Sequence, residues 1–164
     1  MNYLELAEKK ILDEGSLSQM LALWKFRQFS IVFTNGCFDI LHLGHIDYLS
    51  KARALGDLLV IGLNTDASVS RIKGPGRPVN NQYARSMLLA SMRFTDAIVL
   101  FDEDTPYNLI QKIQPQILVK GTDYKLDDIV GVDIVRANGG QVVTIDFLEG
   151  YSTSSIISRL RPDR

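Results

Sequence analysis

Residues 30–55 read SIVFTNGCFDILHLGHIDYLSKARAL, and this stretch decides the fold of the chain. It begins with a run of β-branched and aromatic residues, Ser30 to Thr34, which is typical of a strand. Asn35-Gly36 follows as a turn signal. From Leu43 to Leu55 the apolar residues recur at helical spacing. The stretch therefore predicts a strand, a turn and a helix, the first unit of an alternating α/β fold.

The rest of the chain repeats this alternation. Further strands are predicted at 58–63, 97–101, 117–119 and 142–145, and further helices at 80–92, 106–113, 129–137 and 152–160. This order predicts a Rossmann-like, parallel five-stranded sheet with helices on both faces. Residues 1–29 carry one or two additional helical patterns, with Trp24 as the expected anchor. We therefore expect an N-terminal helical appendage (1–29) on a domain of residues 30–164.

The composition is that of a globular protein of 164 residues, 46% hydrophobic, with a formal net charge of −1. This near-neutral balance argues against a broad nucleic-acid-binding surface. The single cysteine, Cys37, excludes an intramolecular disulfide framework, and we expect a small buried hydrophobe rather than a nucleophile. No apolar run approaches the roughly 20 residues that span a bilayer, and the first residues lack the pattern of a signal peptide. We expect a cytoplasmic protein with no membrane or nucleic-acid partner.

Both histidines of the chain, His42 and His45, lie at the predicted start of the helix that follows the first strand. A spacing of three residues places them on one helix face, near backbone N–H groups that attract anions. Gly44 lies between them and Gly36 lies in the turn, so a ligand can approach the backbone closely. The pattern favours a phosphate-binding site.

Two other interpretations of the histidine pair stay open. The first is a metal site in which Asp39 or Asp47 supplies a third ligand. The second is purely structural, with His42 capping or packing and His45 at the surface. Two glycines in a turn directly after a strand favour phosphate over both.

Basic residues gather between the second and third predicted strands. Arg71, Lys73 and Arg77 are punctuated by glycine and proline, and Arg85 follows on the next predicted helix. Isolated cations of this kind commonly form a solvated surface. The glycines here also suit a mobile clamp on the phosphates of a nucleotide or a sugar.

Two more polar segments follow predicted strands. Lys120-Gly121-Thr122-Asp123-Tyr124 comes after the fourth strand, where a glycine permits close approach of a ligand. Ser152 to Ser155 lie where the fifth strand gives way to the last helix. Hydroxyls and free amides at a helix N-terminus can hold nucleotide phosphates, although one of these residues acting as an ordinary N-cap would also explain the position.

The motif HLGH at residues 42–45 resembles the HxGH signature of the nucleotidylyltransferase superfamily, whose members share a Rossmann-like fold. The surrounding TNGCFDILHLGHIDYL resembles the cytidylyltransferase-like branch. KGTDY at 120–124 and EGYSTSS at 149–155 are similar to the adenylyltransferases that activate D-glycero-β-D-manno-heptose 1-phosphate. The resemblance runs from about Ile31 to Leu160. In many bacteria such a module follows a sugar kinase, for which we expect this chain to have no room.

The resemblance implies an enzyme that transfers AMP from ATP to a sugar 1-phosphate and releases pyrophosphate. It implies Mg²⁺ carried by ATP rather than held in a dedicated protein site, and a homo-oligomer. The implied catalytic residues are His42, His45 and Lys73. The implied nucleotide-binding residues are Thr34, Gly36, Cys37, Phe38, His42, His45, Lys120, Gly121, Asp123, Ser152, Thr153 and Ser154. The implied substrate-binding residues are Asp39, Arg77, Arg85 and Tyr124.

Two alternative functions remain at this point. One is a glycerol-3-phosphate cytidylyltransferase-like enzyme, because no spacing in the sequence distinguishes adenine from cytosine. The other is a catalytically idle nucleotide-binding module that regulates a partner. The intact HLGH motif and Ser/Thr tract count against the second, since an idle site does not need groups that stabilise a transition state.

Overall fold

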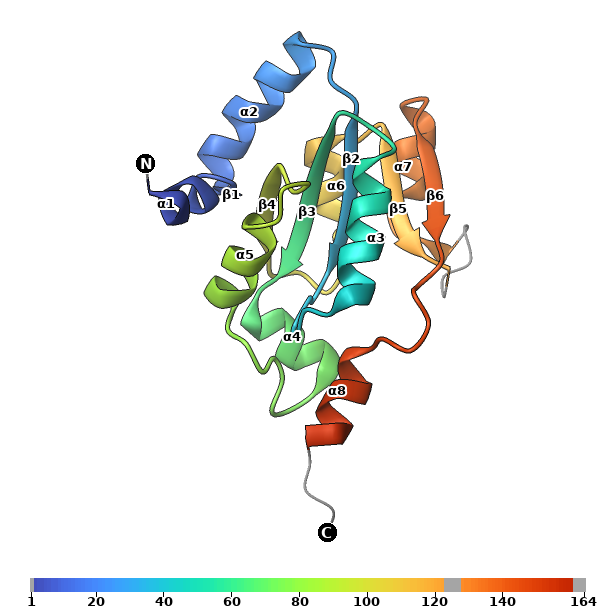
Figure 1. Cartoon of the computed structure of the whole chain (residues 1–164). Helices are drawn as coiled ribbons and strands as arrows, with labels where there is room; N and C mark the ends of the chain where they lie inside the picture. The colour runs from blue at the N-terminus through green and yellow to red at the C-terminus, as the bar shows by residue number, and fades with distance from the viewer. Residues whose placement is uncertain (1, 123–127, 161–164) are drawn as a thin grey trace.

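The structure is a computed structural model that describes residues 2–122 and 128–160 (Figure 1). At its centre lies a parallel sheet of β1 (Ile11–Leu12), β2 (Ile31–Gly36), β3 (Leu58–Asn64), β4 (Ala97–Phe101), β5 (Ile117–Gly121) and β6 (Gln141–Ile145). The strands run in the order β1-β4-β3-β2-β5-β6. The order reverses between β2 and β5, and open parallel sheets bind ligands at the carboxyl ends of the strands beside such a switch point.

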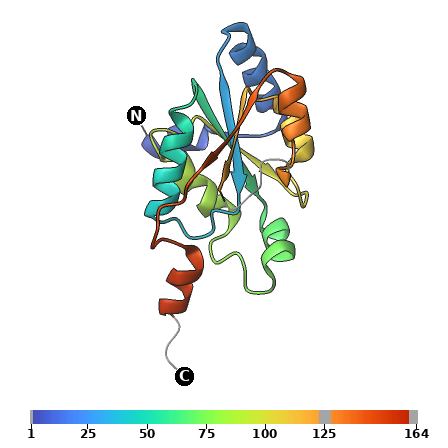
Figure 2. The same cartoon turned by 90° about the vertical axis from the view of Figure 1, so that its right-hand side faces the viewer.

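Helices cover both faces of the sheet and its carboxyl end. They are α1 (Tyr3–Glu8), α2 (Glu14–Phe26), α3 (Leu43–Arg53), α4 (Asp66–Lys73), α5 (Gln82–Ala90), α6 (Tyr107–Ile113), α7 (Val132–Ala137) and α8 (Thr153–Leu160). Because side chains alternate along a strand, Phe33 packs in a core with α2, α6 and α7, whereas Val32 packs in a second core with α1, α3 and α5. Figures 1 and 2 show α4 and α8 beyond the ends of the strands, where they can border a ligand site.

The predicted fold class is confirmed, with six strands in place of five. The additional strand, β1, lies in the segment for which only helices were predicted, and it pairs through Ile11 and Leu12 with β4. Trp24 is buried in the α2 side of the core, as expected. Helix α4 is a second addition, so Arg71 and Lys73 lie in the last turn of a helix rather than in a loop. None of the helices within 2–122 and 128–160 is both long and apolar enough to cross a membrane.

Candidate active site

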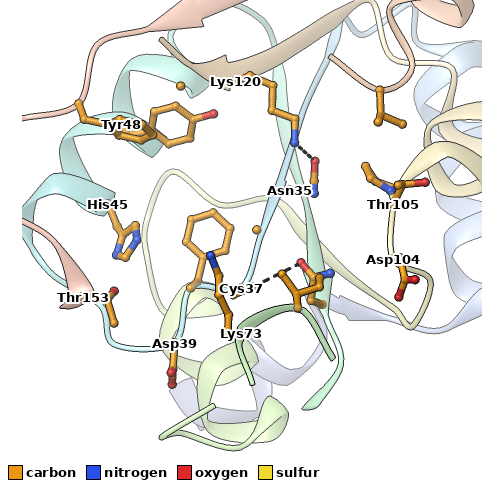
Figure 3. A pocket seen from close by; sticks show the side chains of 18 of the residues that line it. Asn35, Cys37, Asp39, His45, Tyr48, Lys73, Asp104, Thr105, Lys120 and Thr153 are labelled. Atoms are coloured by element: carbon orange, nitrogen blue, oxygen red, sulfur yellow. Dashed lines mark hydrogen bonds between the residues drawn. The ribbon is translucent and has the colours of Figure 1, made fainter. Parts of the chain in front are cut away.

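A cavity of about 560 Å³ opens at the carboxyl ends of β2 and β5 (Figure 3). Segments that are distant in sequence contribute to its walls: the turn after β2, the starts of α3 and α8, the end of α4, and the residues after β4 and β5. Most of the predicted site residues line it, namely Gly36, Cys37, Phe38, Asp39, His45, Lys73, Arg77, Lys120, Gly121, Thr153 and Ser154. The fold therefore gathers these residues at the switch point.

A second cavity, of about 580 Å³, is lined by both histidines. His42, Gly44 and residues 147–153 contribute to its lining. His45 and Thr153 line both cavities, as does Phe147. His45 thus borders both cavities and His42 borders the second, and each cavity could take one part of a reacting pair.

The imidazole rings of His42 and His45 are stacked, with centroids 3.8 Å apart and planes inclined by 21°. Both come from the first turn of α3, where His42 is the N-cap residue but makes no side-chain capping hydrogen bond. The Nδ1 atoms of both rings are buried and have no hydrogen-bond partner among the residues that the structure describes. Because a buried polar atom is costly to leave unpaired, these two atoms indicate a place for a hydrogen-bonding ligand.

The surroundings of the pair favour neutral imidazoles in the unliganded protein. Burial lowers the pKa of His42. Burial, together with the charge of His42, lowers the pKa of His45 to about 4. Because an anion would favour the charged form of either ring, binding of a phosphate should raise both pKa values.

The lowered pKa of His45 predicts a specific loss of stability in acid. Between pH 6.5, the ordinary pKa of histidine, and about pH 4, the unfolded chain binds a proton that folded His45 does not. The free energy of unfolding should therefore fall as the pH is lowered through this window, by about 3 kcal/mol from this residue. Urea unfolding between pH 7.5 and pH 4.5 measures it, with His45→Gln as the reference. Equal pH dependence in the two proteins would contradict the assignment.

Gly44 makes the stacking possible. A Cβ atom at this position would lie 3.1 Å from the ring of His42 and 3.2 Å from the Cβ of Tyr151. A side chain here would therefore displace the His42 ring or the segment before α8, in addition to restricting access of a ligand. Gly36 is similarly close to the ring of Phe38, whose backbone is in the left-handed region with φ of 44°.

Replacement of Gly44 by alanine should lower turnover about 10-fold to 100-fold with a smaller effect on stability, because a displacement of about 1 Å at reacting groups has such an effect. Steady-state rates of the transfer reaction that the sequence resemblance implies, followed by pyrophosphate release, measure the change. Gly15→Ala is the matched control, because a Cβ on this α2 glycine would meet only an Asp13 oxygen at 3.7 Å. Equal rates for the Gly44 variant and the unmodified protein would show that the ring position is not critical.

Two residues predicted to bind substrate, Arg85 and Asp39, make hydrogen bonds to other parts of the protein. The Arg85 side chain is fully buried and donates to the carbonyl oxygens of Asn80 and Cys37 and to the carboxylate of Asp66. The Asp39 carboxylate, 1% exposed, is occupied by donors from the protein. These internal partners favour a structural role for both side chains, and their direct contact with a substrate stays a prediction.

Thr34, predicted to bind nucleotide, contacts another side chain in the structure. Its side chain is fully buried, and its hydroxyl shares a hydrogen bond of 2.9 Å with the hydroxyl of Tyr48. Thr34 therefore supports Tyr48, which lines the cavity. Ser152 lines the second cavity, but its hydroxyl accepts from the Ser155 amide at 3.1 Å, which is the ordinary capping role.

The predicted cations divide into two groups. Lys73 and Arg77 line the cavity, whereas exposed Arg71 does not line it and is paired with Asp102 and with the lining residue Asp104. Lys120 lies at the other wall and donates to Asn35, as Figure 3 shows. Predicted binding residues Asp123 and Tyr124 fall outside the residues that the structure describes.

Cys37 lies in this turn with its thiol 4.0 Å from the side-chain oxygen of Asn64. Burial raises its pKa, and the nearby charges of Lys73, Arg85 and Arg77 only partly oppose that effect. A thiol held in its neutral form is a poor nucleophile, in agreement with the sequence-based expectation.

The structure offers no support for the metal interpretation of the histidine pair. Of the two candidate third ligands, Asp39 is paired with Arg77 and Asp47 is paired with Lys51 at 2.7 Å. Within the described part of the chain, no three histidine, cysteine, aspartate or glutamate side chains are grouped so that they could hold a metal ion.

Several lining residues were not predicted, including Tyr48, Asn64, Asp104, Thr105, Asp128 and Phe147. Tyr48 lies three residues after His45, so the same helical spacing that pairs the histidines could have identified it. Asp104 and Thr105 follow β4, and the rule that ligands bind after parallel strands could have identified them. Phe147 carries no comparable signal in the sequence.

A cavity at the switch point of a Rossmann-like sheet, with an HxGH histidine pair stacked at a helix N-terminus, defines a nucleotidyltransferase. The family model described as cytidylyltransferase-like matches residues 33–159. The chain belongs to the cytidylyltransferase-like family.

Curated relatives and solved structures agree with this assignment. The chain is 54% identical over 151 residues to the bifunctional protein HldE of Mesorhizobium japonicum, covering 92% of this chain and 30% of that protein. It is 59% identical over 131 residues to HldE of Campylobacter concisus, covering 80% of this chain and 27% of that protein. The chain thus spans about 30% of the length of these relatives.

Among solved structures, the lipopolysaccharide core biosynthesis protein of Thermoplasma volcanium matches with a TM-score of 0.60 and 29% identity, over 76% of this chain and 99% of that chain. Pantoate-β-alanine ligase of Francisella tularensis matches with a TM-score of 0.59 over 93% of this chain and 73% of that chain. At 16% identity, this second likeness shows the fold alone.

Proposed function

We propose that the protein transfers AMP from ATP to D-glycero-β-D-manno-heptose 1-phosphate, giving ADP-heptose and pyrophosphate. The observation that carries this proposal is the stacked histidine pair at the switch point, where His45 lines two cavities and His42 lines one of them. The resemblance of residues 120–124 and 149–155 to heptose 1-phosphate adenylyltransferases supports the choice of sugar and base.

In this reaction an oxygen of the sugar phosphate attacks the α-phosphorus of ATP, and the bond from that phosphorus to the bridging oxygen of the β-phosphate breaks. The attacking phosphate is already ionised near neutral pH, so no protein base or covalent nucleophile is needed. The requirement is alignment of the two ligands and compensation of charge on the phosphoryl oxygens.

The described side chains suit that requirement. His42 and His45 would contact the α-phosphate from the helix N-terminus, supplying hydrogen bonds where negative charge develops. Lys73 and Arg77, which line the first cavity, would neutralise phosphate charge. Thr153 and Ser154, at the start of α8, would hold the departing pyrophosphate. The second cavity, bordered by Phe147 and the segment to Ser152, would accommodate the base.

ATP would enter as its Mg²⁺ complex. Mg²⁺ binds phosphate oxygens readily and keeps several waters, so it does not need a cage of protein ligands. When bound, the ion would neutralise part of the triphosphate charge. Asp104 and Asp128 line the first cavity and are the described carboxylates from which water-mediated contact could come.

The proposal is tested by incubating the protein with Mg²⁺, each of the four nucleoside triphosphates and a panel of phosphorylated substrates, and measuring pyrophosphate. We expect release with ATP and heptose 1-phosphate, and only background release when the sugar is omitted. Release with CTP and glycerol 3-phosphate would instead support the cytidylyltransferase alternative. Binding of ATP without release for any acceptor would support a regulatory module and overturn the proposal.

A further inference from the structure

The carboxylate of Asp39 accepts three hydrogen bonds from the segment that follows α4. One of its oxygens accepts from Arg77 Nε at 2.6 Å. The other accepts from the backbone amides of Val79 at 2.7 Å and Asn80 at 3.0 Å. The Asn80 side-chain amide also donates to the Asp39 carbonyl oxygen at 2.9 Å. Four hydrogen bonds therefore join the turn that precedes the histidine pair to the segment that carries Arg77.

Only one edge of the Arg77 guanidinium, the edge that carries Nε, is hydrogen-bonded within the described residues. Its Nε is used by Asp39, and its two terminal nitrogens have no hydrogen-bond partner among the residues that the structure describes. The side chain lines the first cavity and is 22% exposed, so those nitrogens are accessible to a ligand. A guanidinium presents its N–H groups in a rigid planar fork, and fixing Nε also fixes the direction of the free edge.

The positive charge of Arg77 indicates what kind of ligand would bind the free edge of its guanidinium. The Asp39–Arg77 pair is buried on the carboxylate side, so Asp39 cannot be released without leaving an unpaired buried charge and two unpaired amides. A ligand must therefore bind Arg77 while Asp39 stays in place. The group that best matches a planar pair of N–H donors is an oxyanion such as phosphate.

We propose that Asp39 is a positioning residue: it orients Arg77 so that the free edge of the guanidinium binds a phosphate group in the first cavity. This inference deepens the proposed function and rests on phosphate ligands entering that cavity. Asp39 would thus affect ligand affinity only by orienting Arg77, and it would not contact the ligand itself.

The test is a double-mutant cycle with Asp39→Asn, Arg77→Ala and the combined variant. Calorimetry measures the dissociation constants of pyrophosphate and of heptose 1-phosphate, and steady-state rates give KM and kcat. Arg77→Ala should weaken at least one of these two ligands about 10-fold to 100-fold, as expected for loss of charge-assisted hydrogen bonds. Asp39→Asn should weaken the same ligand, with a smaller effect on kcat. The combined variant should bind no more weakly than Arg77→Ala.

Asp96 provides the matched control. Its carboxylate accepts from Arg53 Nε at 2.9 Å and from the Leu59 amide at 2.8 Å, and neither Asp96 nor Arg53 lines either cavity of the site. Asp96→Asn should reduce stability, as Asp39→Asn does, but leave ligand affinity unchanged. Equal loss of affinity in both variants would show a merely structural effect and overturn the proposal.

Two other results would also overturn it. The first is additive losses in the double-mutant cycle, which would mean that Asp39 acts independently of Arg77. The second is unchanged affinity for the phosphate ligand in Arg77→Lys, which would mean that a positive charge suffices without a fixed orientation. This variant tests the need for orientation even if Asp39→Asn does not fold. If the unmodified protein binds pyrophosphate but transfers no AMP, the proposed function fails while this cycle can still be measured.

Discussion

Replacement of His45 by alanine should lower the rate of pyrophosphate release by at least about 100-fold to 1000-fold, the usual effect of removing a donor that stabilises transition-state charge. His45 lines both cavities, and its ring is held against His42 on one side and the edge of Phe38 on the other. Its position is therefore fixed before any ligand arrives, and the loss should appear mainly in kcat. Single-turnover and steady-state rates of pyrophosphate release measure it.

Controls for this variant follow from the same geometry. Circular dichroism and thermal unfolding at neutral pH should show a folded protein, because His45 is not a member of either apolar core. The double variant of His42 and His45 should be little slower than either single variant, since stacked residues that act as a unit are not additive. Normal turnover in folded His45→Ala would refute the role given to the pair.

The alternation of strands and helices could be predicted because each element carries its own pattern. Ile31 to Phe33 and the apolar face of α3 are examples of patterns that depend only on neighbouring residues. Strand β1 has two residues and exists because Ile11 and Leu12 pair with Ile98 and Val99, which is a tertiary cause. Helix α4 did carry a local signal: Thr65 caps it by accepting from the Ser68 amide.

The site was predictable where it depends on residue type and on position after a strand. The histidine pair, the turn at Gly36 and Lys120 at the end of β5 met both conditions. Gly36, His45 and Lys120 line the first cavity, and His42 lines the second. The sequence could not reveal which charged side chains form their hydrogen bonds and ion pairs with other residues of the protein. Asp39 and Arg85 have the chemistry of substrate ligands, but burial and internal partners make both parts of the scaffold.

Replacement of Arg85 by methionine should destabilise the fold by about 2–4 kcal/mol, because two carbonyl oxygens lose a charge-assisted hydrogen bond and half-buried Asp66 loses its ion-pair partner. The guanidinium joins three segments: it binds the Cys37 carbonyl at 2.6 Å, the Asn80 carbonyl at 3.0 Å and the Asp66 carboxylate at 2.7 Å. Methionine fills much of the space but leaves all three acceptors without this donor. Urea unfolding measures the change, with Arg27→Met on the exposed end of α2 as the control.

The same variant separates a scaffold residue from a ligand of the substrate. If Arg85 holds the turn at Cys37 against the segment at Asn80, stability and turnover should fall together. Arg85→Lys should then remain unstable, because a single ammonium cannot reach three acceptors in the directions that a guanidinium does. A variant that kept its full free energy of unfolding but lost affinity for the sugar phosphate would place Arg85 among the substrate ligands. The fully buried side chain makes the first outcome the expected one.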